Sequence, residues 1–170
     1  KDRNFLYHQL CLLAKTLGID LESAQQMKTI LDKVRKTVHE IDRLTWEGDK
    51  VTGEENHIWN VSTSDLMGDY ELFGEKALEF LENANARPEL DYDIRLGYIG
   101  VPPICCDLYS FLGKLRVHVV FNEVQRQFSM PYHTHTLTEQ YLLYTYPFDV
   151  FFHIKDIQKE IEVRKIDGII

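Results

Sequence analysis

The sequence is poor in cysteine and has no long apolar run. Three cysteines among 170 residues, an odd number, do not make a disulfide framework, so we expect a reducing, cytoplasmic location. No apolar segment approaches the roughly 20 residues of a membrane-spanning helix, and no signal-like segment opens the chain. Basic residues are also few: 19 Lys and Arg stand against 27 Asp and Glu, which gives a formal net charge of −8. This balance argues against nucleic acid or an anionic membrane as the main partner.

The sequence does contain enough apolar residues, 44% of the chain, for one folded domain or one domain with a helical appendage. Residues 1–87 read as a helical subdomain of about four helices. Leucines recur at helical spacing in the first segment, which Gly18 ends in the manner of a C-terminal cap. Asp20 can cap a long second helix whose apolar stripe runs from Leu21 to Leu44. Between the stripe positions lie charged residues that we expect on a solvated face: Lys28, Lys33, Arg35, Lys36 and Glu40.

Two further helices complete this part of the chain. Thr52-Gly53-Glu54-Glu55 has the capping-box pattern, which predicts a helix from there to about Met67. A fourth helix should follow Gly68-Asp69 and end before Arg87-Pro88.

The pattern changes at Pro88, and residues 88–170 read as an α/β domain. We expect strands at 94–99, 117–121 and 167–170, separated by helices at about 104–114 and from Pro147 to about Arg164. Residues 122–136 read as a long polar stretch. Strands that alternate with helices predict a short parallel sheet in βαβαβ, Rossmann-like order behind the helical subdomain. The chain starts without Met and stops on Gly168-Ile169-Ile170, so we expect a fragment that is truncated after its third strand.

Ligands of open parallel sheets bind at the carboxyl ends of the strands, which directs attention to two loops. The first loop carries Gly100, Pro102, Pro103 and Cys105, followed by Cys106. The second follows a buried strand and carries Asn122, Glu123, Gln125 and Arg126. As a group, the second loop is the better candidate for a ligand-facing surface. The alternative is that these polar side chains only cap helices and satisfy the loop backbone.

The sequence predicts no metal site within the chain. Cys105 and Cys106 are adjacent, whereas metal and dithiol motifs space their cysteines by two or more residues. Either thiol could be reactive at a helix N-terminus or could be a small packed residue. His133 and His135 could chelate a metal in an extended segment, but no carboxylate or cysteine accompanies them at a convincing spacing, so we expect a solvated loop.

Three segments resemble the 2-hydroxyacyl-CoA dehydratase family, which includes the benzoyl-CoA reductase-type subunits. They are Arg95-Leu96-Gly97-Tyr98-Ile99-Gly100-Val101-Pro102-Pro103, then Val119 to Pro131 (VVFNEVQRQFSMP), and finally Glu162 to Ile170 (EVRKIDGII). The segment Lys50-Val51-Thr52-Gly53-Glu54 agrees more loosely with the region that precedes the family's sheet. Together the resemblance covers most of the chain.

The resemblance implies a lyase that removes water from 2-hydroxyacyl-CoA esters by a ketyl-radical route. It implies a 4Fe-4S cluster in the parent protein, a second dehydratase subunit, an ATP-dependent activator protein and an acyl-CoA substrate. Family cluster cysteines match neither Cys105 nor Cys106, so this piece alone is expected to bind no cluster and to be inactive. Catalytic residues stay unassigned. The two loops would supply one wall of the substrate or cluster cavity, through Gly100, Pro102, Pro103, Cys105, Asn122, Glu123, Gln125 and Arg126.

Two other functions remain open at this point. The chain could be a non-catalytic module whose α/β domain binds a small ligand or CoA, or has a regulatory role. A metal hydrolase built around His133 and His135 is the third possibility.

Overall fold

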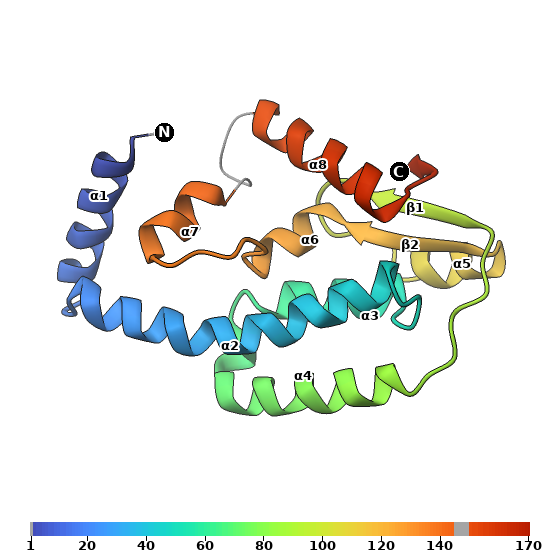
Figure 1. Ribbon diagram of the computed structural model, residues 1–170, viewed down its shortest axis with the longest axis horizontal. Coiled ribbons are helices and arrows are strands. Elements are labelled where there is room, and N and C mark those ends of the chain that lie inside the picture. Colours follow the sequence, from blue (N-terminus) through green and yellow to red (C-terminus); the bar gives the residue numbers. More distant parts are fainter. Residues whose placement is uncertain (1, 145–149) are drawn as a thin grey trace.

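The computed structural model describes residues 2–144 and 150–170. Within these ranges the chain forms an α/β fold in which helices surround a small parallel sheet (Figure 1). The helices are α1 (Arg3–Thr16), α2 (Leu21–Trp46), α3 (Gly53–Ser62), a 3-10 turn at Leu66–Gly68, α4 (Tyr70–Asn85), α5 (Leu108–Lys114), α6 (Glu123–Phe128), α7 (Leu137–Leu143) and α8 (Val150–Arg164). None of the helices in the described ranges combines the length and the apolar character that crossing a bilayer requires.

The sheet confirms the α/β class predicted from the alternation of strands and helices. Its strands are β1 (Ile94–Tyr98), β2 (Val117–Asn122) and the short β3 (Gly168–Ile169). All pairings are parallel and the spatial order is β2-β1-β3, so β1 is central. The chain therefore leaves β1 in one direction to form β2 and passes to the other side of β1 to form β3. Such a reversal places a crevice at the carboxyl ends of the strands.

Local signals in the first 87 residues set the helix starts as predicted, but α3 ends at Ser62 and not near Met67, because a turn and the 3-10 turn at Leu66–Gly68 follow it. Asp20 caps α2 by accepting a hydrogen bond from the Ser23 amide at 2.7 Å. Thr52 and Glu55 form the expected capping box at the start of α3. Gly18 follows α1 with a φ of 74°, a left-handed conformation that glycine adopts without steric cost.

The helical part has its own apolar core. Helices α2 and α4 run side by side and in the same direction, and α3 returns the chain between them (Figure 1). Val38, Ile41 and Leu44 of the predicted α2 stripe are buried there together with Phe73 and Ala77 of α4. The N-terminal half of the stripe is less covered, since Met27 is exposed and Leu31 half-buried.

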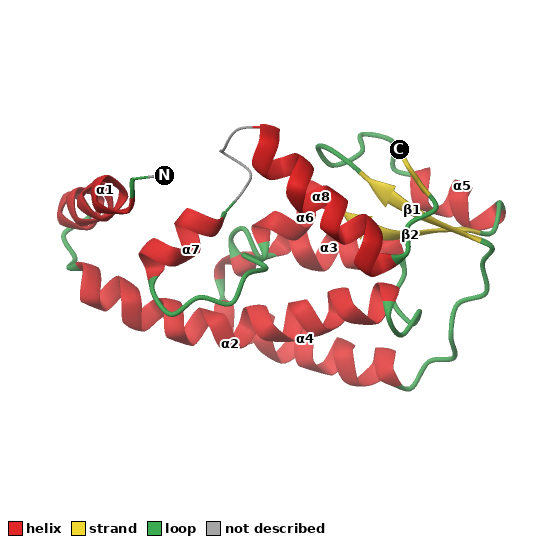
Figure 2. Ribbon diagram, turned by 45° about the horizontal axis from the view of Figure 1, so that its top comes forward, coloured by secondary structure: helices red, strands yellow, loops and turns green. Residues whose placement is uncertain are grey.

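Strand β2 connects this core to the sheet. Val119, Val120 and Phe121 are all buried, which confirms that their nearly unbroken apolar run belongs to a strand covered on both faces. Helices α2 and α3 pack beside β2, and α8 crosses the same region from the other side (Figure 2). Residues before and after position 88 therefore share contacts along β2.

The stretch 122–136 is a loop only from residue 129 onward, and the prediction is wrong for residues 123–128. Helix α6 starts directly after β2, and α7 starts at Leu137, where the sequence suggested no helix. The reason is that Glu, Gln and Arg have high helix propensity, so a polar segment rich in them can form a helix. Gln125, Arg126 and Gln127 are all buried against neighbouring helices instead of facing water.

Three smaller expectations also need correction. Helix α5 begins at Leu108 and not near Ile104. Val101 and Ile104 do not pack in the core: both side chains are exposed, and Ile104 is fully exposed. Lys28 is not on a solvated face: it is buried, since its ammonium donates to the Asp32 carboxylate and, at 2.9 Å, to the Thr134 carbonyl. The predicted helix start at Pro147 lies outside the described residues, and α8 is described from Val150.

Candidate functional site

The two segments singled out after β1 and β2 meet at the carboxyl edge of the sheet. The backbone amide of Gly100, in the loop that follows β1, lies near the carboxylate of Glu123, the first residue of α6, and acts to lower its pKa. Gly100 has a φ of 116°, a conformation that side-chain-bearing residues rarely adopt, so this loop geometry depends on glycine. Parallel pairing of β1 with β2 brings the two loops to the same edge, as predicted.

A histidine from α8 completes this contact. The Nδ1 atom of His153 lies 3.4 Å from Oε1 of Glu123. The Glu123 side chain is 3% exposed and that of His153 is 23% exposed. Burial raises the pKa of Glu123 above its ordinary value, against the opposing effects of His153 and the Gly100 amide. We call Gly100, Glu123 and His153 the strand-end site.

The strand-end site can hold and transfer a proton. Its carboxylate is buried and its imidazole is the member that solvent reaches. An imidazole oriented by a buried carboxylate is a common arrangement for general acid–base catalysis. In such a pair the histidine would exchange the proton with a ligand and Glu123 would position the ring.

Asn122, which precedes Glu123, already uses its side-chain amide within the fold. Its Nδ2 donates to the Gly53 carbonyl and to Oδ1 of Asn56, both at 2.9 Å. Its Oδ1 accepts from the Tyr109 hydroxyl at 2.8 Å. Asn122 therefore joins the end of β2 to α3 and α5.

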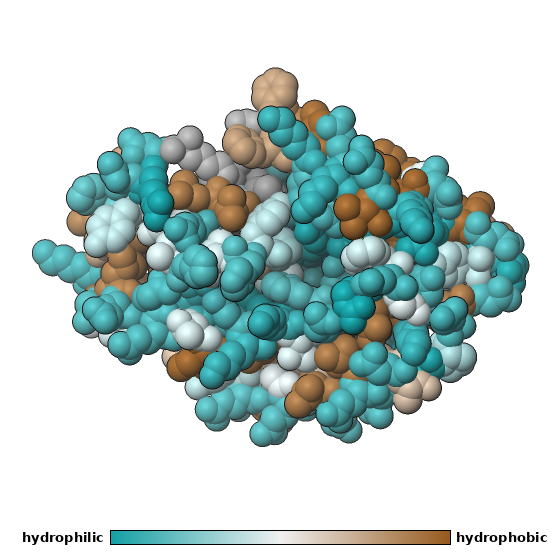
Figure 3. All heavy atoms as spheres, viewed as in Figure 1, coloured by the Kyte–Doolittle hydropathy of each residue, from teal (hydrophilic) through white to brown (hydrophobic). Residues whose placement is uncertain are grey.

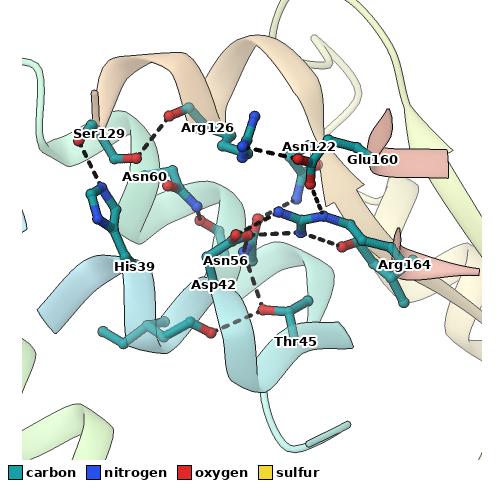
Figure 4. Close-up of polar contacts among 12 residues, drawn as sticks. His39, Asp42, Thr45, Asn56, Asn60, Asn122, Arg126, Ser129, Glu160 and Arg164 are labelled. Carbon is teal, nitrogen blue, oxygen red and sulfur yellow. Dashed lines mark hydrogen bonds and ion pairs between the residues drawn. The ribbon is translucent and has the colours of Figure 1, made fainter. Parts of the chain in front are cut away.

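Arg126 belongs to a buried ionic network of five residues, and Figure 4 shows its part formed by Arg126, Glu160, Arg164 and Asp42. Its guanidinium contacts Asp156 at 3.1 Å and Glu160 at 3.0 Å. Glu160 also contacts Arg164 at 2.7 Å, and Arg164 contacts Asp42 of α2 at 2.6 Å. The charges alternate from Asp156 to Asp42, so each arginine lies between two carboxylates. We call Asp42, Arg126, Asp156, Glu160 and Arg164 the ionic network.

The network also shapes a surface cavity. Arg126 and Arg164 line a cavity of about 240 Å³ together with Asp42, Glu160 and His39. Burial acts to raise the pKa of Asp42, but Arg164 outweighs it and holds that pKa below the ordinary value. Burial lowers the pKa of His39, whose Nε2 lies 2.9 Å from the Ser129 carbonyl. Arg126 thus lines this cavity with its charge already matched by Asp156 and Glu160.

Gln125 differs from its neighbours because its amide is buried without a partner. It is fully buried, and neither Nε2 nor Oε1 has a hydrogen bond among the described residues. Buried polar groups are nearly always paired, so an unpaired amide beside the strand end is unusual.

The remaining loop residues lie near this edge without forming a cluster. Pro102 and Pro103 are half-buried, whereas Cys105 and Cys106 are exposed free thiols. His133 and His135 are exposed, and their rings lie 5.5 Å apart. Across residues 2–144 and 150–170 no three His, Cys, Asp or Glu side chains gather in a way that could hold a metal ion.

Sequence reasoning missed His153, Asp42 and Arg164. Their neighbours in the sequence do not indicate these contacts, because the partners are distant. His153 contacts Glu123, 30 residues earlier, and Arg164 contacts Asp42, 122 residues earlier. Only the crossing of α8 over β2 and α2 brings them together.

Comparison of the chain with models of protein families, with curated proteins and with solved structures found no match in any of the three.

Proposed function

We propose that the chain is part of a 2-hydroxyacyl-CoA dehydratase-type subunit, in which the carboxyl edge of its parallel sheet forms one wall of the substrate site. The observation that carries the proposal is the contact between Gly100 and Glu123. These residues belong to two separate segments that resemble the family, and they meet where α/β proteins bind ligands.

In this proposal the strand-end site handles the proton that dehydration requires. Loss of water from a 2-hydroxyacyl-CoA removes a hydroxyl group and a β-hydrogen, so a group at the site has to exchange protons with the substrate. His153 is half-buried and is the more accessible member of the pair, and we assign this exchange to it. Glu123 acts as a positioning residue, because it is buried against the imidazole.

The described residues do not fit a 4Fe-4S cluster. Such clusters use four cysteine thiolates, whereas the chain has three cysteines and only Cys105 and Cys106 are neighbours. In the proposal the cluster ligands come from other parts of the parent protein, and no step of the reaction is assigned to cluster chemistry here. The second subunit, the ATP-dependent activator and the cytoplasmic location belong to the same proposal.

The test is an anaerobic dehydration assay on the complete subunit that contains this chain, with its partner subunit and activator. We expect formation of the 2-enoyl-CoA only when ATP and activator are present. We expect His153→Gln to lower kcat with little change in KM, whereas His8→Gln, at an exposed position of α1, should leave both unchanged. Absence of ATP-dependent product would contradict the proposal.

A non-catalytic module that binds a small ligand or CoA is the second candidate. It is favoured by the fact that Asn122 and Arg126 already use their polar groups within the fold. This alternative predicts saturable CoA binding by calorimetry. It also predicts that the complete subunit shows no cluster absorbance after anaerobic reconstitution with iron and sulfide, and no turnover.

A further inference from the structure

A second hollow region lies away from the strand-end site, between α2 and the chain from Met130 to α7. It consists of two cavities that share Arg35 and Met130. Figure 3 shows hydrophilic residues over much of the face along α2, with apolar residues gathered over α7. We call the two cavities together the α2 groove.

One end of the α2 groove is basic. This cavity, of about 410 Å³, is lined by Lys33, Arg35 and Lys36, with His39 and His133 beside them. Among the described residues its only acidic lining residue is Asp32, whose carboxylate is already paired with the buried Lys28. In a chain with a formal charge of −8, this cavity concentrates positive charge.

The other end of the groove is apolar. This cavity, of about 440 Å³, has a wall of hydrocarbon and aromatic side chains from α2, α7 and the connecting segments: Ile19, Met27, Leu31, Met130, Leu137 and Tyr141. Each cavity lies within the roughly 300–1,000 Å³ that is typical of small-molecule sites.

The order of residues along α2 explains the change from apolar to basic. Leu31, Arg35 and His39 follow each other at steps of four residues and therefore share one face of the helix. Met27 lies one more step toward the apolar end. Met27 and Arg35 are separated by about 12 Å along the helix axis, from the rise of about 1.5 Å per residue.

Arg35 at the junction has unused hydrogen-bonding capacity. Its Nε is buried and has no hydrogen-bond partner among the described residues. The buried Arg126 and Arg164 contrast with the half-buried Arg35, because each lies between two carboxylates. A buried guanidinium nitrogen without an acceptor is unfavourable, and an anion bound beside it would supply that acceptor.

We propose that the α2 groove binds an organic acid with a hydrocarbon chain of medium length. The carboxylate pairs with Arg35 at the basic end, and the chain lies in the apolar cavity toward Met27. Lys33 and Lys36 at the rim add attraction for the anion. This site shares no residue with the strand-end site, so binding of the acid can be tested independently of the proposed dehydratase function.

Calorimetric titration of the protein with a series of straight-chain acids from butanoate to octanoate tests the proposal. We expect saturable binding whose Kd falls about fourfold with each added methylene, from the transfer free energy of a buried CH₂. Octanol should bind more weakly than octanoate, because it lacks the charge. Inorganic phosphate should bind more weakly too, because it lacks the chain.

Variants separate the two ends of the groove. Arg35→Gln should weaken octanoate binding by about 10- to 100-fold, the range for loss of a charge-assisted hydrogen bond. The matched control is Arg43→Gln, an exposed arginine of the same helix that lines neither cavity, and its Kd should be unchanged. Ala24→Phe, which fills the apolar cavity from its α2 wall, should remove the dependence on chain length even if Arg35→Gln does not fold.

Four results would overturn the proposal. They are the absence of saturable octanoate binding, an unchanged Kd in Arg35→Gln, octanol that binds as tightly as octanoate, and phosphate that binds as tightly as octanoate. The third result would identify a purely apolar pocket and the fourth a general anion site.

Discussion

Replacing Arg164 by methionine perturbs the ionic network at the point where it joins α8 to α2. The guanidinium contacts Asp42 at 2.6 and 3.0 Å and Glu160 at 2.7 Å, and it donates to the Val120 carbonyl at 2.9 Å. It also lies over the rings of Trp46 and Phe121, at 5.4 and 4.9 Å from their centroids. Methionine retains much of this packing and removes the charge, so the variant isolates the ionic contribution.

The expected loss of stability follows from burial. The side chains of Arg164 and Asp42 are 2% and 12% exposed, and removing one partner leaves a buried carboxylate without its cation. Such a change lowers the free energy of unfolding by about 3–5 kcal/mol. For a chain of this size the melting temperature should fall by about 6–20 °C. Arg43→Met is the control, because its pairs with Glu40 and Glu47 are exposed and contribute about 0.2–1 kcal/mol.

The same variant should have a distinct pH dependence. In the native protein Arg164 holds the pKa of Asp42 below its ordinary value, so this contribution is present above about pH 3.9 and is lost as pH falls through the lower, folded-state pKa. Without Arg164, burial dominates and raises the pKa of Asp42 above the unfolded value. The variant should therefore recover stability relative to the native protein as pH falls from 7 toward 4.

Urea unfolding at pH 7, 5.5 and 4 measures both effects. A loss below about 1 kcal/mol at pH 7 would show that the network does not stabilise the fold in the manner described. A difference between variant and native protein that stays constant over this pH range would refute the assignment of the effect to Asp42.

Three other changes test single features of the fold. Thr52→Ala removes the capping box of α3 and should lower the free energy of unfolding by about 1 kcal/mol, measured by urea unfolding, whereas Thr16→Ala, in the exposed last turn of α1, should have a smaller effect. Gly53→Ala places a Cβ 2.6 Å from the Val119 carbonyl oxygen, so we expect a loss of about 1–3 kcal/mol in the same assay; an unchanged midpoint would show that α3 and β2 can separate at little cost. Glu123→Gln should not destabilise the protein at neutral pH. Burial raises the pKa of Glu123, so ionising this carboxyl group costs more free energy in the folded protein than in the unfolded chain, and glutamine avoids that cost. Any advantage of the glutamine should shrink as pH falls toward the ordinary pKa of a glutamate, and a marked loss at pH 7 would mean that the charge itself stabilises α6.

The sequence was sufficient for elements whose determinants are local. The capping box at Thr52, the cap at Asp20 and the left-handed residue at Gly18 each depend on neighbours within a few positions. The apolar run of β2 also identified a buried strand correctly, because a strand covered on both faces needs no alternation.

Sequence patterns failed where polar residues are buried by distant partners. Arg126 and Gln127 belong to the segment predicted as a ligand-facing loop, yet both contact Asp156, about 30 positions later. Lys28 lies among exposed helix positions, but its ammonium is buried and donates a hydrogen bond to the carbonyl of Thr134, 106 residues away. No periodicity reports such pairs, because hydrophobic patterning describes apolar faces only.

For the candidate site, the sequence indicated which two segments meet at the carboxyl edge of the sheet, but not which side chains meet there. The rule for parallel strands pointed to Gly100 and Glu123, which do meet. It could not supply His153, since that residue arrives on a helix whose position depends on the whole crossover connection.

The decisive measurement for the strand-end site is the rate of ATP-dependent dehydration of a 2-hydroxyacyl-CoA by the complete subunit with its partner and activator. We expect His153→Gln to lower kcat strongly and Glu123→Gln to lower it less, with the fold retained in both. Glu54→Gln, at an exposed position of α3, should have no effect. Equal rates in all three variants, or no ATP-dependent turnover in the native protein, would contradict the assignment of the strand-end site to this reaction.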